Sequence, residues 1–588
     1  MGQEHCRSFI TVPRAALLAL LTCGAATAAE VDPYIGFLGD GTAVYPDCRP
    51  ETEWSEYSYE QRKRGRMKWD EPTGEQVKNI VWKTELPMWG NGQPIIVDGN
   101  IYLMHEMPYW DLVSLGPSLV CLDPADGSVR WSKEVHHLDM LPSSQARELV
   151  ELWLAERQLV VDKWRLAWRM HLADPKDQEE IDAIWQKAVA LGVTKKDDKK
   201  YGTKLGDNDM GDTGRFWKGR PEGYGERMTR LKEHGLFHPS WGELSMITPG
   251  RWMGETFPTP VSDGEHIWVR TARHLLACFD LDGEQQWMIR YTQAEGYCDF
   301  APSPILVGDV LVLYSSASRN SDKVIARGFD KASGRQLWQI PGGAPSYAIG
   351  TPAILTLASA RQVVFLPSGH VIDPQDGKIL CEVPCHLAAA DNPIAQGDVV
   401  YMRNSQSGGG YGGDEKGVPK SLQAIRVVEQ GGTVEAEVLW RKVTGEDGKG
   451  FSTGLVVLDG LLFTQADKGV SVLDAANGTV LNHAKTGGKS WNIYSAGGYI
   501  FSGDDRSAEA TVLSGDRELR TIGRQQVSQP KKIPADQWHY RNEKQNWGVI
   551  GTPFPMTFSG NRIFLRTWFD LYCIGNPKTP LRLSPRNR

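Results

Sequence analysis

The chain has 588 residues, including 62 glycines and 21 tryptophans, with a formal net charge of −7 and a pI near 6.1. A weakly acidic chain has no overall positive field, which argues against proteins that hold nucleic acid or anionic lipid through net charge. After the N-terminus, no segment is long and apolar enough to be a membrane span. The glycine and tryptophan counts favour a protein with many tight turns and a recurrent aromatic packing residue.

The first 29 residues have the pattern of an export signal. Arg7 and Arg14 precede the apolar run 15–21, and Ala26-Thr27-Ala28 supplies a small-x-small cleavage site. We therefore expect a protein exported to the periplasm or the extracellular space. The stretch 20–23 is a weaker match to a lipoprotein box, because Thr22 stands where a smaller residue is normal.

Residues 30–77 form an N-terminal extension that contains the basic run Arg62–Arg66, which we interpret as a solvated arm. The stretch 79–84 follows it and resembles the fourth strand of a repeat unit that lacks the first three. Residues 78–132 are therefore expected to hold a closing strand and a first blade.

A short pattern recurs along the chain, running from Asp through a turn Gly to an aromatic or apolar residue. Its clearest copies lie at 121–131 and 328–338, and a copy at 278–287 is one residue shorter. The copies at 371–381 and 472–482 keep the turn and lose the Trp. A repeat of this period, with short strands around each turn, predicts a propeller or a solenoid.

Each repeat unit can be divided into four strands, and eight units can be counted from their openings. Most openings are Pro-containing strands followed by a tight turn, and they begin near Gln93, Thr259, Ser303, Thr351, Asn392, Gly454, Ile493 and Thr552. The last unit lacks a fourth strand, ends at residue 575 and is followed by the tail 576–588. Because the stretch 79–84 can supply the missing strand, we expect an all-β, eight-bladed propeller closed by an N-terminal strand.

Residues 133–250 interrupt the repeat, and the blades resume over 251–575. The helical spacing of apolar residues over 143–171, and a second such stretch at 177–191, predicts a helical insertion, while 195–236 is expected to be irregular. Because the insertion leaves after a fourth strand and returns before a first strand, it stands on that face of the ring. A lid over the channel mouth and a decoration of the rim are both compatible with this placement.

The Asp-x-x-x-Gly-x-x-x-Trp repeat resembles the tryptophan-docking motif of the pyrroloquinoline quinone (PQQ) propeller superfamily. That superfamily includes quinoprotein alcohol dehydrogenases and the non-enzymatic BamB outer-membrane assembly lipoproteins. The resemblance covers residues 78–132 and 250–575. It implies that five tryptophans pack one blade against the next, namely Trp82, Trp131, Trp287, Trp338 and Trp440.

Ligands of a propeller usually bind where the fourth-to-first connections converge on one end of the central channel. Those connections are rich in aromatic and amide side chains, which suit a sugar ring, a quinone or a peptide proline. The candidate ligand-binding residues are Trp89, Asn91, Trp252, Tyr347, Asn392, Phe451, Trp491, Asn492 and Trp547.

A PQQ dehydrogenase requires Ca²⁺ held by oxygen ligands, a catalytic Asp, and a Trp beneath the planar cofactor. Asp299 and Asp391 are the candidate catalytic residues, and Asp299 and Asn492 are the candidate metal ligands. They match no dehydrogenase motif, and the chain lacks the adjacent cysteines that most such enzymes carry. We therefore expect no cofactor, with PQQ and Ca²⁺ as the alternative.

The stretch from Cys381 to His386 is a CxxxCH sequence, a rare relative of the haem c attachment motif. Cys381 also stands at the docking position of its repeat, which accounts for it without haem. Cys121, Cys278 and Cys573 fall at apolar strand positions, where a thiol serves as a small hydrophobic side chain.

These patterns favour an exported scaffold that binds a ligand, a protein or a glycan at the channel mouth, and do not favour nucleic acid. The first alternative is an enzyme, a PQQ- and Ca²⁺-dependent dehydrogenase with unconventional ligands. The second is a polysaccharide-active enzyme, for which the carboxyl groups of Asp299 and Asp391 would have to lie about 5–10 Å apart.

Overall fold

Residues 34–56 and most of the repeat region are described by the structure, a computed structural model. The full set is 34–56, 77–86, 92–106, 117–135, 143–145, 147–148, 151, 186, 226, 229, 258–271, 274–291, 302–315, 324–342, 350–383, 392–404, 421–443, 451–466, 469–486, 492–504, 509–527, 555–567 and 570–585. The predicted signal sequence and the basic run 62–66 lie outside these residues.

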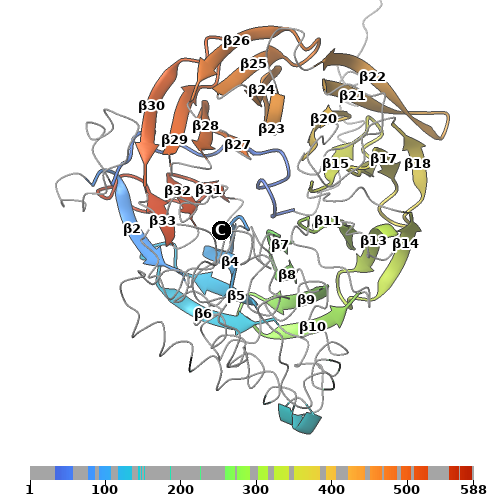
Figure 1. The fold of residues 1–588 in the computed structure, drawn as a ribbon, viewed down its shortest axis with the longest axis vertical. Coiled ribbons are helices and arrows are strands. Elements are labelled where there is room, and N and C mark those ends of the chain that lie inside the picture. Colours follow the sequence, from blue (N-terminus) through green and yellow to red (C-terminus); the bar gives the residue numbers. More distant parts are fainter. Residues whose placement is uncertain are drawn as a thin grey trace, which may run out of the picture.

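Eight antiparallel sheets follow one another around a ring, which confirms the predicted eight-bladed propeller (Figure 1). Blade one comprises β3 (Ile95–Val97), β4 (Asn100–Glu106), β5 (Pro117–Leu122) and β6 (Val129–Glu134). Blade two comprises β7 (Val261–Ser262), β8 (His266–Arg270), β9 (Leu275–Asp280) and β10 (Gln285–Arg290). Blade three comprises β11 (Ile305–Val307), β12 (Val310–Tyr314), β13 (Val324–Asp330) and β14 (Gln336–Pro341).

The next three blades repeat this order. Blade four comprises β15 (Ala353–Thr356), β16 (Gln362–Phe365), β17 (His370–Ile372) and β18 (Ile379–Glu382). Blade five comprises β19 (Ile394–Gln396), β20 (Val399–Asn404), β21 (Ser421–Gln430) and β22 (Thr433–Val443). Blade six comprises β23 (Phe451–Leu458), β24 (Leu461–Ala466), β25 (Gly469–Asp474) and β26 (Val480–Lys485).

The last two blades include strands from the N-terminal part of the chain. Blade seven comprises β27 (Ile493–Ala496), β28 (Tyr499–Asp504), β29 (Glu509–Ser514) and β30 (Thr521–Gln526), and β1 (Val44–Tyr45) adds to it as a fifth, parallel strand. Blade eight comprises β31 (Met556–Ser559), β32 (Arg562–Arg566), β33 (Asp570–Ile574) and β2 (Ile80–Glu85). The pairing of β2 with β33 confirms the predicted closure of the ring by an N-terminal strand.

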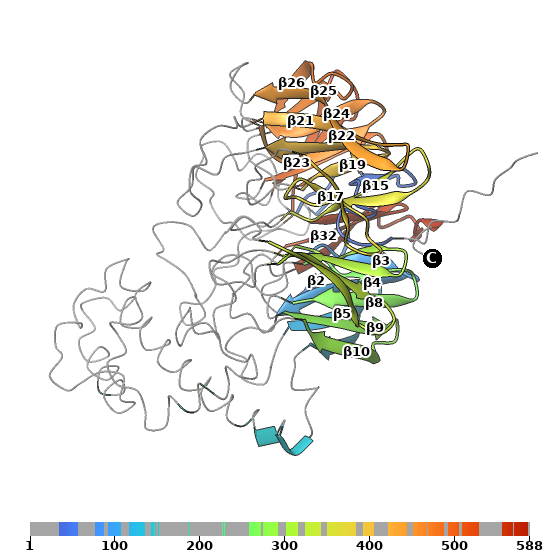
Figure 2. The same ribbon diagram turned by 90° about the vertical axis from the view of Figure 1, so that its right-hand side faces the viewer.

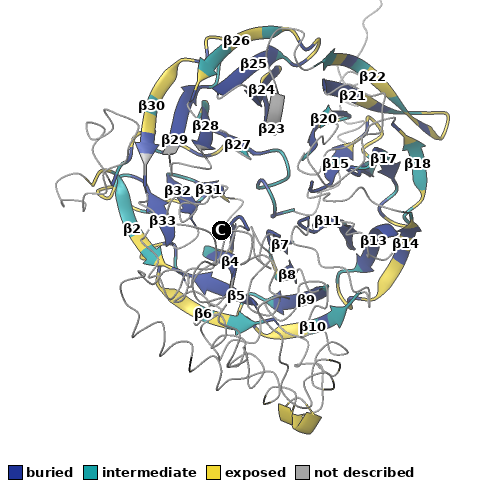
Figure 3. Cartoon of the chain, viewed as in Figure 1, coloured by how far each residue is buried: buried dark blue, intermediate teal, exposed yellow. Residues whose placement is uncertain are grey.

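Burial increases from the rim of the ring toward its centre. The three inner strands of each blade are mostly buried, whereas the outermost strands alternate exposed and half-buried residues (Figure 3). The buried apolar side chains pack between the faces of neighbouring blades, as expected for sheets that stack around an axis.

The repeated Asp and Gly build the turn between the third and fourth strands. In blade four the Asp373 carboxylate accepts the main-chain N–H of Gln375, and the Asp373 carbonyl accepts that of Gly377. Gly377 has a φ of +72°, a conformation that favours glycine. The motif therefore closes a hairpin by local hydrogen bonds.

Each repeat tryptophan packs on the turn glycine of the next blade. A Cβ added at Gly377 would lie 2.5 Å from Cε3 of Trp338, and the Trp338 indole N–H donates to the Pro374 carbonyl at 2.9 Å. The other four pairs are Trp82 with Gly127, Trp131 with Gly283, Trp287 with Gly334 and Trp440 with Gly478. Three of these four also donate to a carbonyl of the next blade, namely Trp82, Trp287 and Trp440.

Three blades have another residue at this docking position. Cys381 takes it in blade four, where it pairs with Val371 and is half-buried. Asn482 takes it in blade six and donates its amide to the Glu518 carbonyl at 2.7 Å. Gly523 takes it in blade seven, opposite Val512, so that blade presents no side chain to the next one.

Of the predicted insertion 133–250, residues 133 and 134 belong to β6, so blade one extends two residues beyond the predicted boundary. The other described residues after 135 are 143–145, 147–148, 151, 186, 226 and 229, and all of these are helical. Residues 226 and 229 lie where we expected irregular chain, in a stretch rich in Arg, Lys, Glu and Met, which are good helix formers. Figure 2 shows the ring from the side, with all eight blades in one layer. No helix among the described residues is long and apolar enough to cross a membrane.

Candidate functional site

The eight innermost strands line the central channel, and a belt of hydrogen bonds links five of them. In these blades the residue before the strand proline is polar, and in blades two to five its side chain accepts the main-chain N–H of the same position in the preceding blade. The bonds run from Gln93 to Thr259, from Thr259 to Ser303, from Ser303 to Thr351 and from Thr351 to Asn392, at 2.8–3.2 Å. Because proline lacks an N–H, the residue before it is the one that can donate across the blades.

One end of this channel is occupied by residues 34–48, which we call the plug segment (Figure 1). Ile35 pairs with Ser262 of β7 through two main-chain hydrogen bonds, and β1 pairs with β27 on the other side of the channel. Both contacts lie where the innermost strands end, next to the turns into the second strands. We call the face that carries these turns the closed face.

Gln93 connects the plug segment to the belt. Its carbonyl oxygen accepts the main-chain N–H of Leu38 at 2.8 Å, and its amide donates to the Tyr45 hydroxyl at 2.9 Å. The same amide donates to the Met556 carbonyl of blade eight. Gln93 is 2% exposed, so a buried amide with all these partners fixes the plug against the ring.

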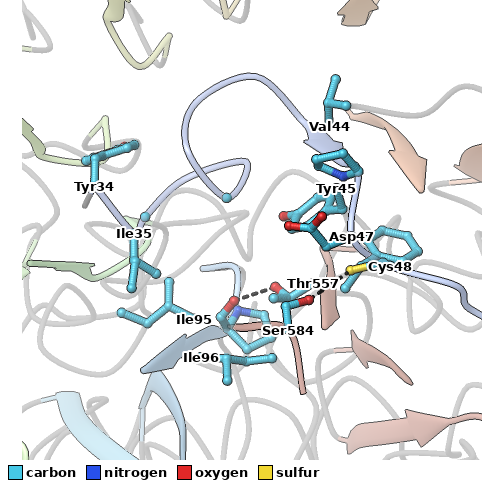
Figure 4. Close-up of a pocket in the computed structure, with 15 residues that line it drawn as sticks. Tyr34, Ile35, Val44, Tyr45, Asp47, Cys48, Ile95, Ile96, Thr557 and Ser584 are labelled. Carbon is cyan, nitrogen blue, oxygen red and sulfur yellow. Dashed lines mark hydrogen bonds between the residues drawn. The ribbon is translucent and has the colours of Figure 1, made fainter. Parts of the chain in front are cut away.

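A small pocket opens on the closed face, between the plug segment and blades eight and one (Figure 4). Its walls are mainly apolar and include Val44, Ile95, Ile96 and Phe558. Burial raises the pKa of the Tyr45 hydroxyl well above its ordinary value, so Tyr45 is a neutral phenol.

The N-terminal extension and the C-terminal tail meet beside this pocket. The Cys48 thiol and the Ser584 hydroxyl of the C-terminal tail lie 3.4 Å apart, and the Arg49 N–H donates to the Gly560 carbonyl in the first turn of blade eight. The tail also donates from the Ser584 N–H to the Ser559 hydroxyl. The closed face is therefore covered near its centre by the N-terminal extension and the C-terminal tail.

Most candidate residues from the sequence lie outside the described residues. They are Trp89, Asn91, Trp252, Asp299, Tyr347, Asp391, Trp491 and Trp547. Phe451 begins β23, where the main chain alone is described. The catalytic roles suggested for Asp299 and Asp391, and the metal-binding role suggested for Asp299, thus stay predictions.

Two candidate amides are described, and both are engaged within the ring. Asn392 is the acceptor at the end of the belt. Asn492 faces the Tyr494 hydroxyl, where it partly offsets the rise in pKa that burial causes. Among the described residues no cluster of His, Cys, Asp or Glu has the geometry of a metal site.

The CxxxCH stretch is described only as far as Val383, so Cys385 and His386 lie outside the described residues. Burial raises the pKa of the Cys381 thiol, which makes it a poor nucleophile. Its side chain packs with Leu380 and Ala436 against the core of blades four and five.

Sequence reasoning missed the plug segment and Gln93. The available signals were a Gln at a position that is Ser, Thr or Asn in the other belt blades, and a cluster of glycines at 36, 39 and 41 in the extension. Gly39 and Gly41 have φ values of +78° and +87°, so they let the chain turn within the channel.

One comparison with known proteins, the family model, agrees with a propeller over part of the chain. A family model described as outer membrane protein assembly factor BamB matches residues 215–411. No curated protein sequence matches the chain significantly. Among solved structures, BamB from Moraxella catarrhalis is 15% identical, with a TM-score of 0.36, over 55% of this chain and 82% of that one.

Two further solved structures belong to proteins of other kinds. A quinohemoprotein alcohol dehydrogenase from Pseudomonas putida is 10% identical, with a TM-score of 0.29, over 86% of this chain and 77% of that one. The Pan2 WD40 domain from Neurospora crassa is 11% identical, with a TM-score of 0.32, over 54% and 88%. These likenesses are too distant to bear on function. The eight-bladed ring confirms the predicted propeller, and the family-model match over residues 215–411 supports the predicted PQQ-like repeat.

Proposed function

We propose that this protein is an exported, non-catalytic scaffold that binds a protein or glycan partner at the channel mouth opposite the closed face. The observation that carries this proposal is the plug segment. Its contacts with β7, β27 and Gln93 close one end of the channel with the protein's own chain. A partner that binds on the axis of the ring therefore has to bind at the other end of the channel.

The chain's connectivity supports the same choice of face. In an antiparallel blade, the first-to-second and third-to-fourth turns lie on one face, and the fourth-to-first connections lie on the other. The closed face carries the tight turns, whereas the long 133–250 insertion and the aromatic connections belong to the other face. Variable, long connections on a rigid ring are where binding residues are usually found.

The resemblance to an outer membrane assembly factor favours a scaffold over an enzyme, and the export pattern of residues 1–29 places the scaffold outside the cytoplasm. Aromatic side chains on the connections suit a peptide or a sugar ring. The partner is therefore a polypeptide or glycan of the periplasm or cell exterior.

The test is site-specific photo-crosslinking in the full chain. A photoreactive residue at Tyr347 or Trp491 reports on the mouth, and one at Asp98 or Glu265, which are exposed on turns of the closed face, is the matched control. We expect adducts from the mouth positions and none from the controls. Adducts from the closed face, or none from either, contradict the proposal, as does reduction of an artificial electron acceptor on addition of PQQ and Ca²⁺.

A further inference from the structure

The seam between blades seven and eight is joined differently from the other seams. The docking position of blade seven is Gly523, and a Cβ there would lie 2.4 Å from Nε2 of Gln525. The repeat therefore offers no side chain at this point. The space is filled by residues 49–56, which we call the seam segment.

Trp54 of the seam segment is fully buried in this seam. Its ring stacks on Phe501 of β28, with centroids 6.2 Å apart and planes 19° apart. The four hydrogen-bonded repeat tryptophans donate to a carbonyl, whereas the Trp54 indole N–H meets no acceptor among the described residues. Packing therefore holds this side chain.

Gln525 clamps the main chain on both sides of Glu53, immediately before the Trp54 side chain. Its carbonyl oxygen accepts the Trp54 N–H at 2.9 Å, and its amide donates to the Thr52 carbonyl at 3.0 Å. Gln525 is 7% exposed and lies on β30. A side-chain amide that pairs in this way with a main chain recognises an extended peptide whatever its side chains are.

Blade eight binds the C-terminal end of the seam segment through hydrogen bonds. Ser55 and Lys78 exchange two main-chain hydrogen bonds, at 3.0 and 2.8 Å. The Glu56 carboxylate accepts from the Tyr572 hydroxyl at 3.1 Å and from the Lys83 ammonium at 3.2 Å. Glu56 is 9% exposed, so its charge is largely withdrawn from water.

We infer that the seam between blades seven and eight is a recognition site for an extended peptide with the pattern Trp-x-Glu, occupied in this chain by residues 52–56. An aromatic anchor in a buried slot, a clamp on the main chain and a paired carboxylate are the elements of a peptide-binding site. The site lies away from the channel mouth and does not depend on the function proposed for it. Covalent attachment keeps the segment at an effective concentration of the order of millimolar, so the slot stays filled.

A peptide-complementation experiment tests this inference. The full chain carrying Trp54→Ala is titrated with a synthetic, acetylated peptide of residues 50–56, and binding is measured by isothermal titration calorimetry. We expect binding at least about tenfold tighter than to the unaltered protein, whose slot is filled, and a loss of about tenfold or more when the peptide's Trp is replaced by Ala. Equal binding to both proteins, or no binding up to about 1 mM peptide, overturns the inference.

A second variant keeps the inference testable if Trp54→Ala does not fold. Gln525→Ala removes the clamp and keeps Trp54, and Asn482→Ala is its matched control because it removes the docking bond of the seam between blades six and seven. Hydrogen exchange should rise in β30 and β2 for Gln525→Ala, and near the turn that holds Glu518 for Asn482→Ala. The inference fails if Gln525→Ala leaves exchange in β30 and β2 unchanged.

Discussion

The contact between a turn glycine and the preceding blade's tryptophan can be isolated with two alanine substitutions. Gly377 and Gly99 have almost the same φ, +72° and +71°. A Cβ at Gly377 would lie 2.5 Å from Trp338, whereas a Cβ at Gly99 meets nothing within 4 Å. Gly377→Ala therefore carries both a backbone cost and a packing cost, and Gly99→Ala carries the backbone cost alone.

The left-handed conformation costs an alanine about 1–2 kcal/mol, and this applies to both variants. Overpacking a well-filled contact costs about 1–3 kcal/mol more, which applies to Gly377→Ala only. We therefore expect Gly99→Ala to lower the free energy of unfolding by about 1–2 kcal/mol and Gly377→Ala by about 2–5 kcal/mol. In a Trp338→Ala background the excess should vanish, because the new methyl group then meets no ring.

Urea unfolding followed by tryptophan fluorescence measures these differences, and the midpoint of thermal unfolding provides a second readout. A large ring need not unfold in one step, so hydrogen exchange in β15–β18 should accompany both. If Gly377→Ala costs no more than Gly99→Ala, or if its excess survives in the Trp338→Ala background, the tryptophan does not dock on this glycine as described.

Three further outcomes are expected. Burial raises the pKa of Glu56, so its contribution to stability is fully present near and below pH 4.5 and is lost as the pH rises through its folded-state pKa. The urea midpoint measured across pH 4–8 should therefore fall less with rising pH in Glu56→Gln than in the unaltered protein. Parallel pH profiles of the two proteins would contradict this. Burial raises the pKa of Cys278 and of Cys573 to about 12, so iodoacetamide at pH 8 should label both in urea and neither in the native protein, as mass spectrometry would show. Asn392→Ala should cost about 1–2 kcal/mol of stability by leaving the Thr351 N–H without its acceptor, and an unchanged urea midpoint would refute a belt role.

The number of blades and the closing strand could be predicted from the sequence because their signals are local and repeated. Asp373, Gly377 and Trp338 each have a fixed offset within a unit, and each makes the same contact in other units. The strand at Ile80–Glu85 could be assigned because the sequence before it contains no first three strands of a unit, whereas the last unit, near the C-terminus, has three strands and lacks the fourth.

The plug and seam segments could not be predicted in this way. They have no repeat, and their partners are distant in sequence: Thr52 and Gln525, for example, are 473 residues apart. Gly523 did mark a seam without a docking side chain, and Trp54 was a tryptophan outside every repeat. The contact between the Gly523 seam and Trp54 is visible only in the three-dimensional structure, since nothing in a single sequence links a docking position without a side chain to the distant residue that fills the space.

The order in which these parts come together follows from their contacts. The seam segment binds β30 through Gln525 and blade eight through Tyr572 and Lys83, and blade eight itself needs β2 from the N-terminal part. Its binding surface therefore exists only after the C-terminal strands have been made. The seam segment is synthesised first and its partner blade last, so the residues in contact are far apart in sequence. Such contacts form late in folding, because the entropy cost of closing a long loop comes before any gain from the contact. The N-terminal extension thus acts on the ring that the blades have formed, closing one end of its channel and one seam.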